Sequence, residues 1–142
     1  MSSWLIYALL SALCAALVAI FGKVGLQQLD ANTATAVRAV IMALFLVGVV
    51  VAQGKLGLVG SILTQHKAML FIVLSGVAGA MSWLFYFMAL KNGSVAQVAP
   101  IDKLSVVFAV ILAVILLGEK ISLLAGVGVA LISAGALLIA LG

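Results

Sequence analysis

Charged residues are scarce in this sequence of 142 residues: Asp, Glu, Lys and Arg make up 7% of it, against about a quarter of an ordinary soluble domain. Apolar residues make up 68%, and the mean hydropathy is +1.50. A soluble domain cannot bury that much apolar surface, so the composition predicts an integral membrane protein. The formal charge of +4 then indicates loop topology and contact with lipid head groups, and not nucleic-acid binding.

Residues that carry out catalysis are equally few. The sequence has one His, one Cys and three acidic residues, and they are scattered along the chain. This set offers no metal cluster and no Ser/His/Asp arrangement, and the chain has neither a phosphate-binding loop nor a dinucleotide-binding motif. We therefore expect no enzyme activity, no metal and no cofactor. Cys14 is the single cysteine, which excludes an intramolecular disulfide. A cleaved signal peptide is not expected, because no basic segment precedes the first apolar run.

Proline occurs once, and the alternation of polar and apolar residues that is typical of membrane strands is nearly absent. At about 20 apolar residues per span, the sequence predicts an all-α integral membrane fold with five transmembrane helices. Capping residues at 30–33 precede the second helix, and the KNGS turn at 91–94 precedes the fourth. Apolar residues at helical spacing within 53–67 also favour a short helix that lies on the membrane. The spans are expected at about 4–22, 33–52, 68–90, 95–117 and 122–141, within one domain over residues 1–142.

The fourth expected span carries Pro100, Asp102 and Lys103 close together. A charge near the bilayer centre costs at least about 2.5–3.5 kcal/mol on insertion scales, so these charges need a partner or a water-filled cavity. If the helix begins near Val95, Pro100 removes one helical hydrogen bond and bends the span, and transporters tend to bind substrate at such bends. Alternatively, the helix begins at Pro100, a favoured first position, and both charges lie at the interface without a function.

Arg38 is the charge expected inside the second span. The second and fourth helices start from the same side, and helical rise places Arg38 and Asp102 both roughly 8–12 Å deep, so an ion pair between them is expected. Trp83 and Tyr86 reach the same level, and Ser105 lies about one turn beyond Asp102. Two other interpretations stay open: Arg38 as a head-group anchor, and the two aromatic residues as interfacial belt residues. The candidate substrate-binding residues are Arg38, Trp83, Tyr86, Pro100, Asp102, Lys103 and Ser105; no residue is expected to be catalytic.

Basic residues are almost evenly divided between the two sides of the membrane. Lys55, Lys67 and Lys120 are expected on the N-terminal side, and Lys23 and Lys91 on the other. Orientation follows an excess of basic residues on the cytoplasmic side. This division therefore predicts a weakly set orientation or insertion in both orientations.

Three stretches of the sequence resemble a known family. They are FGKVGLQQLDANTATAVRAVIM at 21–42, YFMALKNGSVAQVAPIDKLSVVFAVILAVILLGEKIS at 86–122 and AGVGVALISAGALLIA at 125–140. Together they resemble one repeat of the EamA family, which belongs to the drug/metabolite transporter superfamily. Most EamA members have ten helices in two repeats of opposite orientation, whereas this chain has one repeat. The resemblance implies a transporter of small molecules whose working unit is two chains, most simply an antiparallel homodimer.

The leading hypothesis is a secondary transporter that moves a small metabolite or drug-like solute across the cytoplasmic (inner) membrane. Arg38 and Lys103 would bias its cavity toward anionic groups, and Asp102 would couple transport to the proton gradient. Two alternatives stay open: a non-transporting subunit or assembly factor, which needs a partner chain, and a lipid-carrier flippase, whose cavity opens sideways to lipid. The expected partners are a small-molecule substrate, membrane lipids and a second copy of the chain, and nucleic acid is not expected.

Overall fold

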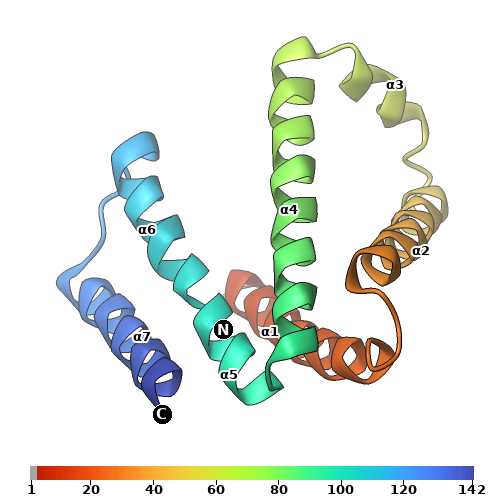
Figure 1. The fold of residues 1–142 in the computed structure, drawn as a ribbon. Helices are drawn as coiled ribbons and strands as arrows, with labels where there is room; N and C mark the ends of the chain where they lie inside the picture. Colours follow the sequence, from red (N-terminus) through yellow and green to blue (C-terminus); the bar gives the residue numbers. More distant parts are fainter. Residues whose placement is uncertain (1–2) are drawn as a thin grey trace. The chain divides into compact units, whose positions relative to one another are not determined.

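This computed structural model describes residues 3–142. Within these residues, all regular secondary structure is helical. Five helical segments are long and apolar enough to cross a membrane. The all-α membrane fold with five spans is thus confirmed. The helices, shown in Figure 1, are α1 (Ser3–Gly25), α2 (Ala31–Ala52), α3 (Gly57–Leu63), α4 (His66–Asn92), α5 (Val95–Asp102), α6 (Leu104–Leu117) and α7 (Leu123–Leu141).

The first two spans are joined by a short connection that ends at a helix cap. The Asp30 carboxylate accepts hydrogen bonds from the Thr33 backbone N–H at 2.8 Å and from the Thr33 hydroxyl at 2.9 Å. These bonds satisfy a backbone donor that the first turn of α2 would otherwise leave open. They also hold the pKa of Asp30 below its ordinary value, because they stabilise the ionised form. The capping chemistry of residues 30–33 therefore starts α2 at Ala31.

A short helix follows the second span, inside the segment where the sequence favoured one. Gly54 has a φ of +67°, which lets the chain turn out of α2. Helix α3 (Gly57–Leu63) comes next, and every one of its residues is exposed. Its placement on the membrane surface stays a prediction.

The fourth span is broken into two helices. Helix α5 starts at Val95, where the Ser94 side chain and the Gln97 side chain form a reciprocal capping box. The alternative start at Pro100 is therefore wrong: Pro100 lies inside α5, and the helix ends at Asp102. Around Lys103 the backbone makes two tighter bonds, from Lys103 N to the Pro100 carbonyl and from Val106 N to the Lys103 carbonyl. Pro100 cannot donate a helical bond to the Ala96 carbonyl, and its ring crowds the turn before it. The break at Lys103 lies three residues after the proline, beyond the turn that the ring crowds.

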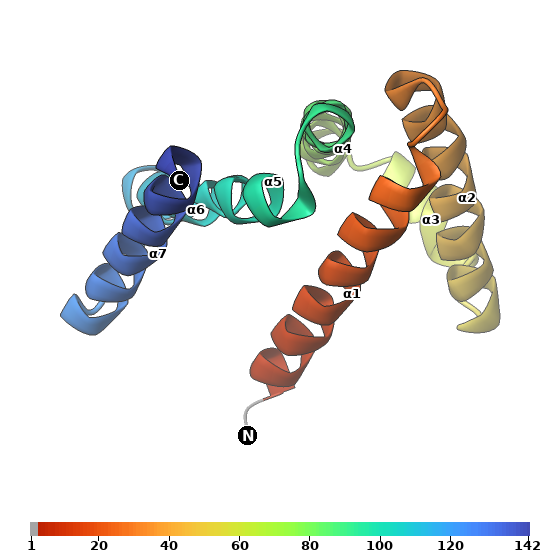
Figure 2. The ribbon, with the colours of Figure 1, turned by 60° about the horizontal axis from the view of Figure 1, so that its bottom comes forward.

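The last span turns back along the two halves of the broken one. Helix α6 ends at Gly118, whose φ is +67°, and the N–H groups of Gly118 and Glu119 both donate to the Ala113 carbonyl. The Ser122 hydroxyl then accepts a bond from Ala125 N and begins α7. Figures 1 and 2 both show α6 and α7 side by side, and α7 packs against α5 as well.

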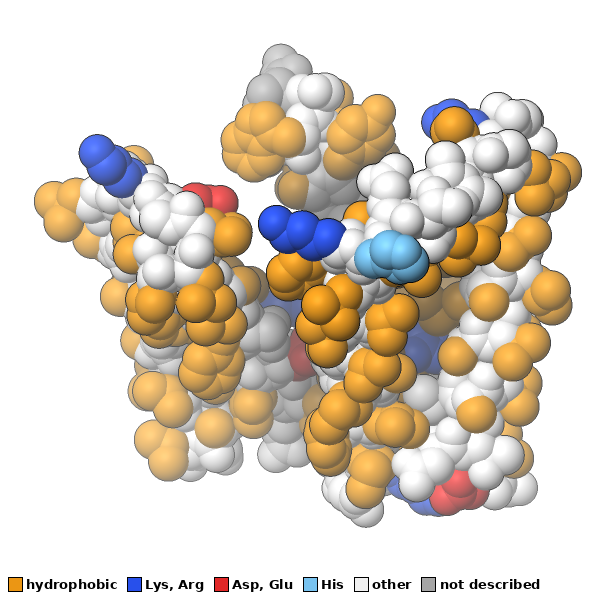
Figure 3. Space-filling view, turned by 90° about the horizontal axis from the view of Figure 1, so that it is seen from above, with side chains coloured by type: hydrophobic (Ala, Val, Ile, Leu, Met, Phe, Trp, Pro, Cys, Tyr) orange, Lys and Arg blue, Asp and Glu red, His pale blue; other side chains and the backbone are white. Residues whose placement is uncertain are grey.

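The described chain forms two compact units, residues 22–91 in one and residues 3–21 with 92–142 in the other. Large apolar side chains cover the outside of the helices, as the orange surface in Figure 3 shows. Phe45, Phe108 and Leu116 are examples, at 71%, 64% and 72% exposure. Such a surface suits lipid tails and other helices, not water. The buried residues are Ala19, Leu26, Ala31, Thr35, Phe87, Leu90 and Ala136, and most of them lie in the 22–91 unit.

Candidate functional site

The 22–91 unit holds an arginine against aromatic rings inside the membrane-spanning helices. Arg38 extends from α2 to α4, where its Cζ atom lies 4.0 Å from the centre of the Trp83 ring and 4.2 Å from that of Phe87. Both distances are within the range of cation–π attraction, which contributes about 0.5–1 kcal/mol when exposed and about 2 when desolvated. The side chain of Arg38 is half-buried. We call Arg38, Trp83, Tyr86 and Phe87 the arginine site.

The three rings of the arginine site also contact one another. Trp83 and Phe87 are four residues apart on α4, so they lie on one face of the helix, with centres 5.6 Å apart and planes at 17°. Tyr86 meets both rings edge-on, at 5.9 Å and 89° from Trp83 and at 5.5 Å and 77° from Phe87. Edge-to-face pairs of this kind are favourable, because the positive edge of one ring faces the negative face of the other. The rings therefore form a fixed surface for the guanidinium.

Phe87 is held in place by the end of α1. It is 2% exposed, and its ring occupies the space that a Cβ atom would fill at Gly22. The missing side chain of Gly22 leaves room for the ring, and a larger residue would force the ring or the helix to shift. Sequence reasoning missed Phe87. The signal available for it was its position four residues after Trp83, on the same helix face.

Two lysines fasten the end of α4 to the α1–α2 connection. The Lys23 ammonium donates to the Leu90 carbonyl, and the Lys91 ammonium donates to the Leu29 carbonyl at 2.7 Å. Lys23 thus bonds a carbonyl in the last turn of α4 and offsets its partial negative charge, whereas Lys91 bonds the loop that follows α1. Leu90, whose carbonyl accepts the first of these bonds, is fully buried. The arginine site is thus built next to the most tightly packed part of the unit.

The rings set how far the arginine lies from the end of α4. Phe87 and Trp83 lie five and nine residues before the end of α4 at Asn92, or roughly 8–14 Å along the helix by its rise per residue. The Arg38 guanidinium lies against these rings, not at the end of a helix. Its Nε atom is buried and has no hydrogen-bond partner among the described residues.

The other candidate residues surround the break at Lys103. The Lys103 ammonium pairs with the Asp102 carboxylate at 3.2 Å, and the two side chains are 55% and 33% exposed. Pro100 is half-buried in α5, and Ser105 is exposed in the first turn of α6. Asp102 thus has its adjacent lysine as a partner, which the sequence did not predict. The expected Arg38–Asp102 pair would join the two units, and it stays a prediction.

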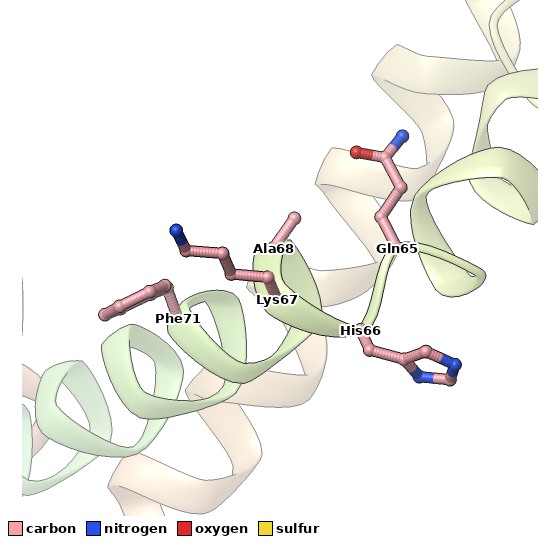
Figure 4. A pocket seen from close by; sticks show the side chains of 5 residues that line it. All are labelled: Gln65, His66, Lys67, Ala68 and Phe71. Carbon is pink, nitrogen blue, oxygen red and sulfur yellow. The ribbon is translucent and has the colours of Figure 1, made fainter.

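A surface hollow of about 540 Å³ lies at the start of α4, lined by Gln65, His66, Lys67, Ala68 and Phe71. Figure 4 shows that these side chains point in several directions and do not converge on one point. Its polar groups therefore offer no binding arrangement. Within residues 3–142 there is no group of three or more His, Cys, Asp or Glu side chains that could hold a metal ion.

Five apolar spans, one of them broken at a charge pair and another with an arginine on aromatic rings, define a multi-pass membrane protein. The chain belongs to the EamA-like transporter family, which matches residues 2–141. It is 47% identical over 138 residues to a protein of Sinorhizobium sp. described as "Uncharacterized transporter in cobO 3'region", a match that covers 97% of this chain and 96% of that protein. No solved structure matches this chain. The protein is thus a membrane transporter.

Proposed function

We propose that this protein is a secondary transporter that moves a small metabolite or drug-like solute across the cytoplasmic (inner) membrane. The observation that carries the proposal is the arginine site. An ionisable side chain within a membrane span is costly, and such residues commonly mark the path of a substrate. Arg38 lies on Trp83 and Phe87 with a buried Nε that has no partner in the described chain. A solute that brings a negative charge to the terminal nitrogens of Arg38 would lower this cost.

The working unit in this proposal is an antiparallel homodimer. A single chain leaves most of its large apolar side chains exposed, including those of α6 and α7. A second copy would cover part of this surface and enclose a path between the copies. Five spans in each chain, with three basic loop residues against two, favour two copies inserted in opposite orientations.

Asp102 supplies the coupling in this mechanism. It pairs with Lys103 at the break of the fourth span, and a second cation within reach would compete for it. The break would allow α5 and α6 to move relative to each other, because Lys103 is the single residue that joins them. We propose that Asp102 exchanges between Lys103 and Arg38, or takes up a proton, as the solute enters and leaves. Each exchange would change the charge that the solute meets.

Topology tests the assembly. Single cysteines at Gly57 and Asn92, introduced in a Cys14→Ser background, are labelled from each side of the membrane, together with reporter fusions at both ends. Labelling of each site from both sides supports the antiparallel homodimer. A single orientation would remove it and favour a subunit that requires a partner chain.

Transport itself is tested with the purified chain in liposomes, by measuring the uptake of labelled metabolites with and without an imposed proton gradient. Uptake that needs the gradient supports the proposal. Binding of a lipid-linked phosphate without solute uptake would favour a lipid-carrier flippase instead.

A further inference from the structure

We propose that the arginine site binds the carboxylate of a singly charged anion whose remaining part is apolar. This inference rests on the proposed function, and it names the class of solute that the site takes. It is carried by three observations: how the rings hold the guanidinium, how the charges inside the spans are compensated, and how deep the site lies.

The rings orient the guanidinium. Its Cζ atom is nearly equidistant from the centres of Trp83 and Phe87, at 4.0 and 4.2 Å, and those rings are themselves fixed by Tyr86 and by the α1 backbone at Gly22. Arginine presents its donors in a planar fork that matches the two oxygens of a carboxylate. Because Nε is enclosed, an incoming anion meets the end of the fork, at the two terminal nitrogens. The neighbouring groups are rings, so the rest of the ligand meets apolar surface.

The compensation of charges limits the ligand to one negative charge. Asp102 and Lys103 neutralise each other at 3.2 Å, so neither adds net charge to its span. Arg38 contacts rings, which attract a cation without neutralising it. One positive charge is therefore left at the arginine site. A carboxylate with one charge compensates it, whereas a dicarboxylate or a phosphate would leave an excess negative charge in an apolar region, which is costly.

Depth separates a soluble anion from a lipid phosphate. The rings lie roughly 8–14 Å along α4 from its end, by helical rise. Lipid phosphates remain at the head-group level, and an arginine that binds them extends toward the end of its helix. Arg38 contacts rings within the span instead. We therefore assign the site to a solute and not to a head group.

Trp83 allows a direct binding test, because the chain has two tryptophans and the other, Trp4, is 68% exposed. The full chain with Trp4→Phe, in phosphatidylcholine nanodiscs at neutral pH, is titrated with cyclohexanecarboxylate while the emission of Trp83 is recorded. Its neutral amide, the dianion adipate and inorganic phosphate serve as comparison probes. We expect saturable binding of the monocarboxylate, and binding at least about tenfold weaker for the other probes, the difference made by one charge-assisted hydrogen bond.

Variants of Arg38 test the fork. Arg38→Gln should abolish the carboxylate response, and Arg38→Lys should weaken it at least about tenfold, because lysine keeps the charge but loses the bidentate geometry. Lys55→Gln, in a loop, is the matched control and should bind like the parent. Circular dichroism and gel filtration check that each variant is folded, and the lysine variant carries the test if the glutamine variant is not. Equal binding of acid and amide, or an unchanged affinity in folded Arg38→Lys, would overturn the proposal.

Competition by lipid and transport of solutes test the inference and the proposed function separately. If phosphatidylglycerol in the nanodiscs competes with the monocarboxylate, the site takes a head group, and the inference fails. If no monocarboxylate binds while another solute is transported by the parent chain, the inference fails and the proposed function stands. If the monocarboxylate binds through Arg38 but no solute crosses the membrane, the proposed function fails and the binding site stands.

Discussion

Two charged regions of this protein solve the same problem in different ways. At the arginine site, Arg38 lies on Trp83 and Phe87. At the break of the fourth span, Lys103 lies beside Asp102. Rings stabilise a cation and leave its charge in place, whereas a carboxylate cancels it. The positive charge of Arg38 therefore persists on its rings, whereas that of Lys103 is compensated by an acid.

The largest effect on transport is expected when the charge in either region is replaced. Arg38→Gln removes the uncompensated charge, and Asp102→Asn leaves Lys103 without its acid. Either change should abolish transport in liposomes without abolishing expression, while Lys55→Gln should leave it unchanged. Transport that survives both changes would show that these residues are not the site.

A second change disturbs the packing between Gly22 and the Phe87 ring. Gly22→Ala puts a Cβ atom into the Phe87 ring, whereas Gly25→Ala on the same helix meets nothing within 4 Å. The forced overlap should cost about 1–3 kcal/mol of stability. Thermal unfolding in detergent and the emission of Trp83 measure it. Equal melting temperatures for the two variants would mean that Phe87 moves aside freely.

A smaller loss of stability is expected when the cap of α5, in the broken fourth span, is removed. Ser94→Ala removes two bonds of the Ser94 hydroxyl, one accepted from Gln97 N and one donated to the Gln97 side chain, at a cost of about 1 kcal/mol. Ser122→Ala removes a single bond to Ala125 N and should cost less. Hydrogen exchange at the first amides of α5 and α7 compares them. Faster exchange in α7 than in α5 would contradict the ranking.

The smallest effect is a pH dependence at the start of α2. The Thr33 N–H and hydroxyl lower the pKa of Asp30, with help from Lys91. A lowered pKa means that this stabilisation is present above the unfolded pKa, about 3.9, and is lost as pH falls through the folded value. Asp30→Asn keeps a capping side chain and should flatten the acid limb of the stability curve. An unchanged acid limb in that variant would assign the dependence to other groups.

Local features of the fold were predictable from the sequence. Asp30 and Ser94 precede apolar helical runs, and both cap the helices that follow. Pro100 predicted a disturbed fourth span, because a missing N–H acts within its own turn. The position of the break at Lys103 was not predictable, because it lies after the turn that the proline disturbs.

The candidate site was predictable only in its parts. Arg38, Trp83 and Tyr86 were singled out by residue type and depth, and the structure brings them together with Phe87. Phe87 itself was missed, because its role depends on the absent side chain of Gly22, which is distant in sequence. Asp102 pairs with its neighbour Lys103, a contact that the sequence analysis did not predict, and the expected Arg38–Asp102 pair stays a prediction.

Composition and hydropathy by themselves determined that this chain is a five-span membrane protein, because apolar length is a property of each segment alone. Motif stretches likewise pointed to the EamA family, to which the chain belongs. Only the tertiary structure decided that Arg38 contacts aromatic rings. That contact joins separate helices, since rings from α4 reach Arg38 of α2, and no local pattern encodes it.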